Sequence, residues 1–243
     1  MAILHWRKKA DYNSVEAYNR YLDKCLKRHR SNIDLAYAEA VGSTSVEMFD
    51  RQGDLQVEVL RHHGLADGAT VFDLGCGSGR TAQALQRSGW QGSYFGSDIV
   101  ERFAERVRQR CPGYSAVAHS EPTIPMPDHS VDLLFHWSVF THIPVEECYL
   151  YMRDIYRVLK PGGRMVFSFL ELAEPAHWRV FESRLGYIEQ GRATPLLDTF
   201  LHRDWIAQFA ARIGFANPRY TSGTEAGHHP PFWQSLAALD KPS

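Results

Sequence analysis

Apolar residues recur along the chain with two spacings, and these divide most of it into alternating strands and helices. Short apolar runs predict strands over 69–74, 93–97, 114–118, 131–137 and 164–170. Between them, apolar residues at three- and four-residue steps predict helices over 80–86, 100–107 and 145–159. Strands that alternate with helices indicate right-handed βαβ units. We therefore predict an α/β fold, a Rossmann-like doubly wound sheet that is mostly parallel, with helices on both faces.

The two ends of the chain follow a different pattern. Residues 14–29 predict an amphipathic helix, and we interpret 1–45 as an N-terminal helical cap segment and 46–243 as the main domain. Residues 54–60 alternate like a strand, but a helix is favoured because Gly64 would then cap its end. After a predicted helix at 205–213, the strand-like runs 216–221 and 232–239 are close enough to pair antiparallel. Residues 171–200 have no regular pattern and are predicted to be irregular.

The sharpest feature is a glycine-rich turn that follows the first predicted strand. It reads Val71-Phe72-Asp73-Leu74-Gly75-Cys76-Gly77-Ser78-Gly79-Arg80. Glycines at alternate positions let the backbone bend tightly and let a ligand approach the main chain closely. The dinucleotide fingerprint G-x-G-x-x-G would need glycine where Arg80 stands. Asp73 would repel a pyrophosphate but suits a cationic amino-acid ligand.

This turn resembles the first motif of class I S-adenosylmethionine-dependent methyltransferases, and three further motifs follow in the family's order. Asp98 stands where the family places the acid that holds both ribose hydroxyls. Residues 125–134 are similar to the family's approach to its fourth strand, and 158–164 to the turn into its fifth. The resemblance covers about residues 65–170 and continues loosely to 240.

The resemblance implies S-adenosylmethionine as cofactor and a set of residues around it. The implied cofactor-binding residues are Asp73, Gly75, Cys76, Gly77, Gly79, Asp98, Ile99, His119, Ser120, His136 and Trp137. The sequence departs from the family at Ser120, where an acid often binds the adenine amino group. A serine hydroxyl can still accept one hydrogen bond there.

On the acceptor side, the run 136–142 follows the fourth predicted strand, and ligands bind outside the carboxyl ends of strands in such sheets. His142 is a candidate general base, with a packed structural histidine as the alternative. Residues 171–200 are predicted to form part of a substrate lid together with the N-terminal helix and its residues Tyr12 and Tyr21; an aromatic packing layer is an equal alternative. The candidate substrate contacts are Tyr18, Phe140, Glu171 and Trp178.

The composition of the chain favours some classes of binding partner and cellular location over others. The 27 Lys and Arg balance 28 Asp and Glu for a net charge of −1, so a nucleic-acid partner is not favoured. The four arginines of 101–110 are interpreted as a solvated face. No apolar run is long enough for a membrane span, and the N-terminus does not resemble a secretory signal. Four separate cysteines favour reduced thiols in a cytoplasmic protein, and 12 histidines without spaced partner ligands predict no metal site.

Together these features predict an enzyme that moves the methyl group of S-adenosylmethionine to an N, O or S nucleophile of a small metabolite. One alternative is a non-catalytic regulator that binds S-adenosylmethionine. The other is a dinucleotide-dependent oxidoreductase, which Asp73 and Arg80 disfavour. The identity of the acceptor and the oligomeric state are not predicted.

Overall fold

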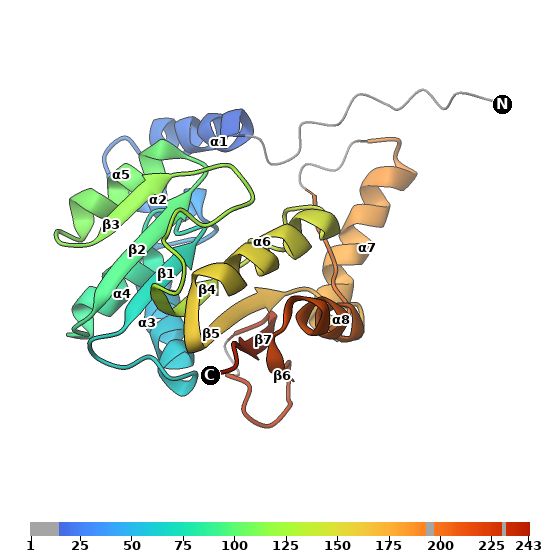
Figure 1. The fold of residues 1–243 in the computed structure, drawn as a ribbon. Coiled ribbons are helices and arrows are strands. Elements are labelled where there is room, and N and C mark those ends of the chain that lie inside the picture. The colour runs from blue at the N-terminus through green and yellow to red at the C-terminus, as the bar shows by residue number, and fades with distance from the viewer. Residues whose placement is uncertain (1–14, 193–196, 230–231) are drawn as a thin grey trace.

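The computed structural model describes residues 15–192, 197–229 and 232–243. In these residues seven strands form one sheet in the order β3-β2-β1-β4-β5-β7-β6 (Figure 1). The strands are β1 Thr70–Leu74, β2 Ser93–Asp98, β3 Ser115–Ala118, β4 Val131–His136, β5 Leu159–Phe169, β6 Ala216–Thr221 and β7 Ser235–Asp240. Strands β1 to β5 pair in parallel, while β7 pairs antiparallel with both β5 and β6. The predicted Rossmann-like sheet and its antiparallel C-terminal strand are confirmed.

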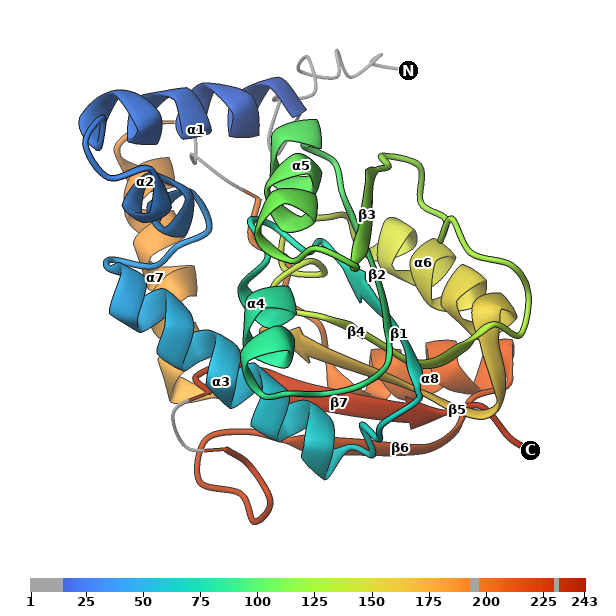
Figure 2. The same ribbon diagram turned by 90° about the vertical axis from the view of Figure 1, so that its left-hand side faces the viewer.

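Helices cover both faces of this sheet. They are α1 Val15–Arg28, α2 Ile33–Ala40, α3 Val46–His62, α4 Arg80–Arg87, α5 Glu101–Arg110, α6 Val145–Val158, α7 Pro175–Glu189 and α8 Arg203–Ile213. Figure 2 shows α3, α4 and α5 on one side of the sheet and α6 and α8 on the other. The helix predicted over 54–60 is the second half of α3. None of the helices among the described residues is long and apolar enough to span a membrane.

The core is split by the sheet into two apolar clusters, because β4 is buried on both faces. Leu134 packs in the cluster on the α6 and α8 side, and its neighbours Leu133 and Phe135 pack on the α3, α4 and α5 side. Parallel strands covered on both faces have near-continuous apolar runs, as β4 does. Packing in the two clusters keeps β2, β1 and β4 side by side, so their carboxyl ends lie together at the same end of the sheet.

The N-terminal helices pack against α5 and the end of β2. Leu22 and Cys25 of α1 and Ala36 of α2 share an apolar cluster with Val100 and Phe103. The short helix α2 was not predicted, because its eight residues give too few apolar repeats. The predicted boundary of the cap at residue 45 stays a prediction.

The interpretation of the α5 arginines as a solvated face is wrong for two of them. Arg102 forms an ion pair with Asp23 of α1, and Arg106 forms one with Asp34 of α2. The Arg106 side chain is only 14% exposed. Opposite charges on the cap and on α5 therefore help to hold the cap beside β2.

The prediction that 171–200 is irregular is also wrong, because 15 of these residues form α7. Pro175 occupies the start of the helix, and the Glu174 side chain accepts a hydrogen bond from a backbone amide of its first turn. Apolar residues at helical spacing were present but were hidden among charged neighbours: Trp178, Phe181, Leu185 and Ile188. Figure 1 shows α7 standing out beside the sheet.

Candidate functional site

The turn between β1 and α4 is bare of side chains where two glycines bend the backbone. Gly75 has φ of +71° and Gly77 has φ of +52°, a region that side chains disfavour. A Cβ atom at Gly75 would lie 2.5 Å from Cγ2 of Val139, and one at Gly77 would lie 3.0 Å from Cγ1 of Val41. Both positions therefore require glycine for backbone conformation and for space.

Asp98, at the end of β2, faces this turn. Its Oδ2 accepts a hydrogen bond from the backbone N–H of Gly77 at 2.9 Å, and its Oδ1 accepts one from Val100 N–H at 2.9 Å. Burial raises the pKa of Asp98 to about 6, while hydrogen bonds from the backbone amides of Val100, Gly77 and Ile99 act in the opposite direction. A carboxylate offers about four acceptor positions, so Asp98 keeps acceptor capacity beyond these amides.

Asp73 lies beneath the turn and is only 2% exposed. The hydroxyl of Tyr94 donates a hydrogen bond to its Oδ2 at 2.8 Å. Burial raises the pKa of Asp73 to about 8, and the hydrogen bond from Tyr94 only partly opposes it. The carboxyl group is therefore largely protonated at neutral pH unless a cation approaches it. Its predicted contact with the cofactor stays a prediction.

The remaining predicted cofactor residues are spread around Asp98 and the turn. Cys76 is buried, Gly79 caps the start of α4, and Ile99 packs against the cap cluster. The backbone N–H of His119 donates to the Asp98 carbonyl at 2.9 Å, which fixes the end of β3 beside β2. Ser120 follows it and is exposed.

Trp137 and His136 point to opposite faces of the sheet. The Trp137 indole N–H donates to Thr81 Oγ1 at 3.1 Å, which places Trp137 beside the start of α4. His136 is fully buried between Phe140 and Phe167, with ring centroids 4.1 and 5.1 Å away. Neither of its ring nitrogens has a hydrogen-bond partner among the described residues. The structure thus places Trp137 beside the turn but His136 and Phe140 in the α6-side core, where packing is favoured over contact with cofactor or substrate.

Burial lowers the pKa of His136 from 6.5 to about 3. Between these two pH values the unfolded chain binds a proton on His136 that the folded chain does not bind, and this favours unfolding. His136 therefore has no effect on the free energy of unfolding above pH 6.5 and lowers it progressively as the pH falls towards 3. At pH 5 this loss is about 2 kcal/mol. We expect His136→Phe to reduce the difference in unfolding free energy between pH 8 and pH 5 by about 2 kcal/mol, measured by urea denaturation. Phe140→Leu is the control, since it alters the same packing without a titrating group; an equal pH effect in both variants would contradict the account.

His142 lies on the turn after β4, beside the segment 197–201. Its Nδ1 donates to the carbonyl oxygen of Leu197 at 3.1 Å, because a carbonyl can only accept. In the neutral ring the basic lone pair is then on Nε2. The backbone N–H of Thr199 donates to the Thr141 carbonyl at 2.8 Å, so the segment is held along the turn at two points.

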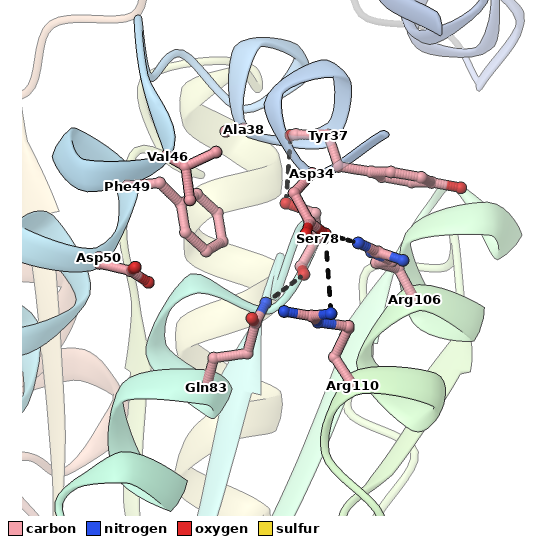
Figure 3. Close-up of a pocket in the computed structure, with 10 residues that line it drawn as sticks. All are labelled: Asp34, Tyr37, Ala38, Val46, Phe49, Asp50, Ser78, Gln83, Arg106 and Arg110. Atoms are coloured by element: carbon pink, nitrogen blue, oxygen red, sulfur yellow. Dashed lines mark hydrogen bonds and ion pairs between the residues drawn. The ribbon is translucent and has the colours of Figure 1, made fainter. Parts of the chain in front are cut away.

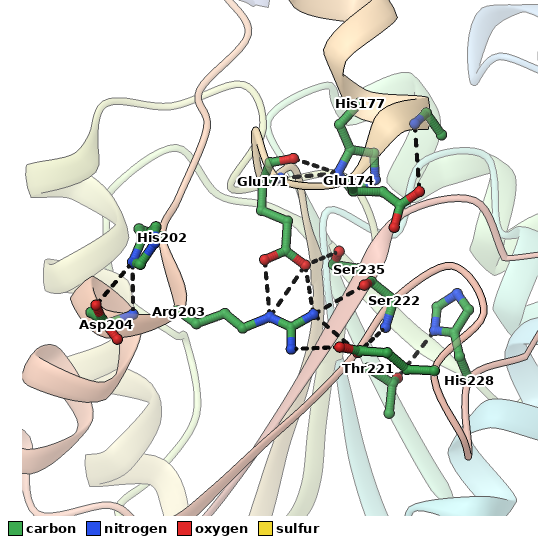
Figure 4. Close-up of polar contacts among 12 residues, drawn as sticks. Glu171, Glu174, His177, His202, Arg203, Asp204, Thr221, Ser222, His228 and Ser235 are labelled. Carbon is green, nitrogen blue, oxygen red and sulfur yellow. Dashed lines mark hydrogen bonds and ion pairs between the residues drawn. The ribbon is translucent and has the colours of Figure 1, made fainter.

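Glu171, at the end of β5, does not present a free carboxylate. It is 5% exposed and forms an ion pair with Arg203 of α8, with Nη2 and Oε1 2.8 Å apart (Figure 4). Ser235 donates to the same carboxylate at 2.6 Å, and Arg203 also pairs with Glu225 at 3.0 Å. This network joins α8 to the end of the sheet, which favours a structural role over the predicted contact with substrate.

The two other predicted substrate residues, Trp178 and Tyr18, lie on different helices. Trp178 is 43% exposed on α7, where its ring packs on Phe181. Tyr18 lies on α1 and packs against the same apolar cluster as Ile99, the residue directly after Asp98. The structure therefore brings Tyr18, but not Trp178, to the Asp98 side of the turn. Tyr12 lies outside the described residues.

A small cavity lies on the cap side of the turn, between α2, α3, α4 and α5 (Figure 3). Its volume is about 50 Å³, and a nucleoside ligand needs a site of about 300 Å³ or more. Its lining residues include Ser78, Gln83 and Arg106. This cavity is too small for the predicted cofactor. Among the described residues, no group of three or more His, Cys, Asp or Glu side chains could hold a metal ion.

Comparison with known proteins agrees with this geometry. Residues 72–167 match the family model "Methyltransferase domain". Malonyl-(acyl-carrier protein) O-methyltransferase of Methylococcus capsulatus is 31% identical over 217 residues, 84% of this chain and 71% of that protein. Demethylmenaquinone methyltransferase of Tropheryma whipplei is 32% identical over 105 residues, and the match spans only 42% of either chain.

Solved structures share the fold at lower sequence identity. A TehB-like S-adenosylmethionine-dependent methyltransferase of Corynebacterium glutamicum has a TM-score of 0.59 and 17% identity, covering 93% of this chain and 100% of that one. Magnesium protoporphyrin IX methyltransferase of Synechocystis, solved with S-adenosylhomocysteine, has a TM-score of 0.58 and 18% identity, covering 81% and 87%. The chain belongs to the class I S-adenosylmethionine-dependent methyltransferases.

The residues at the turn fit the cofactor of this family. At Gly75 and Gly77 the backbone bends with positive φ where Val139 and Val41 leave no room for a Cβ atom, so the tight turn can form. Asp98 keeps acceptor capacity for a ligand hydroxyl while backbone amides fix its orientation. A vicinal diol, as in a ribose, carries hydroxyl groups that can donate hydrogen bonds to this carboxylate.

Proposed function

We propose that the protein transfers the methyl group of S-adenosylmethionine to an N, O or S nucleophile of a small metabolite. The observation that carries this proposal is the pairing of Asp98 with the glycine turn through Gly77 N–H. In this proposal the Asp98 carboxylate would accept hydrogen bonds from a ribose diol beside a glycine turn whose backbone a ligand can approach closely. The near-neutral net charge of −1 supports a small acceptor over a nucleic acid, and we propose a cytoplasmic location on the same sequence grounds.

The protein's contribution is mainly to hold the reacting groups in place. When bound, the cofactor supplies a methyl group on a positively charged sulfur, already activated for in-line displacement by the acceptor's lone pair, with the electron pair of the broken bond staying on sulfur. We expect Asp98 and the glycine turn to hold the nucleoside, and the turn 138–142 to border the acceptor. Positioning of this kind can supply about 7–11 kcal/mol of the barrier reduction.

Oxygen is the acceptor atom that we favour. The relative that is 31% identical over 84% of this chain is named an O-methyltransferase. A hydroxyl or carboxyl acceptor loses a proton before or during attack, so a base close to the acceptor would help. His142 is the candidate, since it lies on the turn after β4, where its Nδ1 is hydrogen-bonded to the carbonyl of Leu197.

We expect His142→Ala to lower turnover by about 100- to 10,000-fold, the usual contribution of a general base, with little change in affinity for S-adenosylmethionine. His142→Gln is the matched variant, because an amide can still donate to the Leu197 carbonyl but cannot take a proton. Turnover and affinity are measured separately by product formation and calorimetry. Normal turnover in His142→Gln would remove His142 as the base.

The proposal is tested by incubating the protein with a metabolite extract and S-adenosylmethionine that carries a labelled methyl group. Mass spectrometry should find a small molecule that gains the label, together with S-adenosylhomocysteine. Tight binding of the cofactor with no labelled product would instead indicate a non-catalytic regulator.

A further inference from the structure

Ser138, in the turn after β4, has a backbone conformation that non-glycine residues rarely adopt. Its φ is +59°, in the left-handed region. Its backbone N–H donates to Ser168 Oγ of β5 at 2.8 Å, and its carbonyl oxygen accepts from Thr141 Oγ1 at 2.7 Å. Its hydroxyl donates to Gln234 Oε1 at 3.0 Å. Residues that several contacts hold in such a conformation cluster at functional sites.

The same turn packs directly on the glycine turn. A Cβ atom at Gly75 would lie 2.5 Å from Cγ2 of Val139, so the Val139 side chain touches the turn at Gly75. Val139 follows Ser138 in the chain. Gln234 is therefore hydrogen-bonded to a residue whose neighbour contacts the proposed cofactor site.

Gln234 itself lies at the end of the sheet where ligands bind. It precedes β7, whose first residue, Ser235, pairs with Phe169 at the carboxyl end of β5. In sheets of this type, ligands bind outside the carboxyl ends of the parallel strands. Gln234 and Ser138 thus meet on the side of the sheet that the acceptor would approach.

The Gln234 carboxamide has an unused donor. The residue is only 5% exposed, and its Oε1 accepts the hydrogen bond from Ser138. In the part of the chain that the structure describes, no group accepts a hydrogen bond from its Nε2. A donor in a buried side chain is unfavourable when it lacks a partner. An oxygen atom of a ligand beside Nε2 would satisfy it.

An aromatic pair comes from the same two segments. Phe232, two residues before Gln234, packs on Trp137, the residue before Ser138, with ring centroids 5.2 Å apart. Both side chains are half-buried, so part of their apolar surface stays accessible. A ligand that binds the Gln234 amide therefore has apolar surface close by.

We propose that Gln234 is a specificity-determining residue that binds the methyl acceptor by donating from Nε2 to a carboxylate or carbonyl oxygen attached to an apolar group. This inference rests on the proposed function and narrows its acceptor to molecules with such an oxygen. Ser138 fixes the amide, because its hydroxyl holds Oε1 and leaves the nitrogen to the ligand. The positive sulfur of the cofactor would also attract a carboxylate.

The test uses Gln234→Glu, because a carboxylate can still accept from Ser138 but has no hydrogen to donate. Gln56→Glu is the matched control: Gln56 is 4% exposed and its Oε1 accepts from the Thr81 hydroxyl at 2.8 Å, but it lies on α3. The full-length proteins are incubated with a dilute metabolite extract and S-adenosylmethionine that carries a labelled methyl group. The wild-type product should contain a carboxylate, ester or carbonyl group. Gln234→Glu should form it at least about 10-fold more slowly with unchanged affinity for S-adenosylmethionine, whereas Gln56→Glu should not.

A second measurement follows binding without turnover. Benzoate, benzamide and benzylamine share a ring and differ in their polar group, and each is added to the protein saturated with S-adenosylhomocysteine. The side-chain amide NMR signals of Gln234, assigned by their loss in Gln234→Glu, should shift with benzoate or benzamide but not with benzylamine. The probe that shifts them more identifies the preferred oxygen.

Three results would overturn the inference: a wild-type product without such an oxygen, undiminished labelling by Gln234→Glu, or Gln234 signals that neither benzoate nor benzamide moves. An extract in which the wild-type protein labels nothing would instead overturn the proposed function. The two failures are therefore distinct.

Discussion

Replacing Asp98 with alanine should weaken the binding of S-adenosylmethionine by about 10- to 150-fold, or about 1.5–3 kcal/mol, the range for hydrogen bonds to a charged group. Asp98 is held by Gly77 and Val100 amides in one orientation and retains acceptor capacity for a diol. Removal of the carboxylate also releases the Gly77 amide, so the turn itself loses a restraint. Isothermal titration calorimetry measures the change directly.

A cofactor analogue without ribose hydroxyls separates the ribose role from general damage to the turn. The 2′,3′-dideoxy analogue should bind wild type more weakly than the cofactor does, and Asp98→Ala should bind both equally. Asp67→Ala is the control, since Asp67 also accepts a backbone hydrogen bond, from Gln91 at 3.0 Å, but precedes β1. A retained preference of Asp98→Ala for the natural ribose would contradict the assignment.

Asp73→Ala should abolish measurable binding of S-adenosylmethionine. The family resemblance places this carboxylate near the cationic amino-acid part of the cofactor, and Asp73 is the single acid in the sequence of residues 69–80. Asp73→Asn is the sharper variant, because an amide oxygen can still accept the hydrogen bond from Tyr94 and so preserves the buried contact. Unchanged affinity in Asp73→Asn would contradict a role for the negative charge.

The raised pKa of Asp73, about 8, adds a pH dependence to this prediction. A cationic ligand favours the charged carboxylate, so binding releases a proton from Asp73 and is opposed at low pH. Wild-type affinity should therefore rise between pH 6 and pH 8, and the Asp73→Asn variant should lack the part of that rise due to Asp73. Calorimetry in two buffers of different ionisation enthalpy measures the released proton; its absence in wild type would contradict the account.

The local part of the site could be predicted from sequence because neighbouring residues specify it. The glycine turn needs only its own residues, and Asp98 follows a short apolar run that predicts β2. Sequence alone could not predict which face of the sheet the His136 side chain occupies. β4 is apolar on both faces, so its pattern has no alternation that assigns a residue to one side of the sheet.

Contacts between distant residues also escaped sequence reasoning. Glu171 and Arg203 are 32 positions apart, and nothing local marks them as partners. Asp23 on α1 and Arg102 on α5 likewise meet only after the cap folds onto β2. Glu171 was predicted to contact the substrate but is an ion-pair partner of Arg203 in the structure.

A crystal structure with S-adenosylhomocysteine would show whether the cofactor binds at the glycine turn. We expect the nucleoside on the backbone of Gly75–Gly79, with the ribose hydroxyls within hydrogen-bond distance of the Asp98 carboxylate. A nucleoside bound elsewhere, or a ribose that does not touch Asp98, would contradict it.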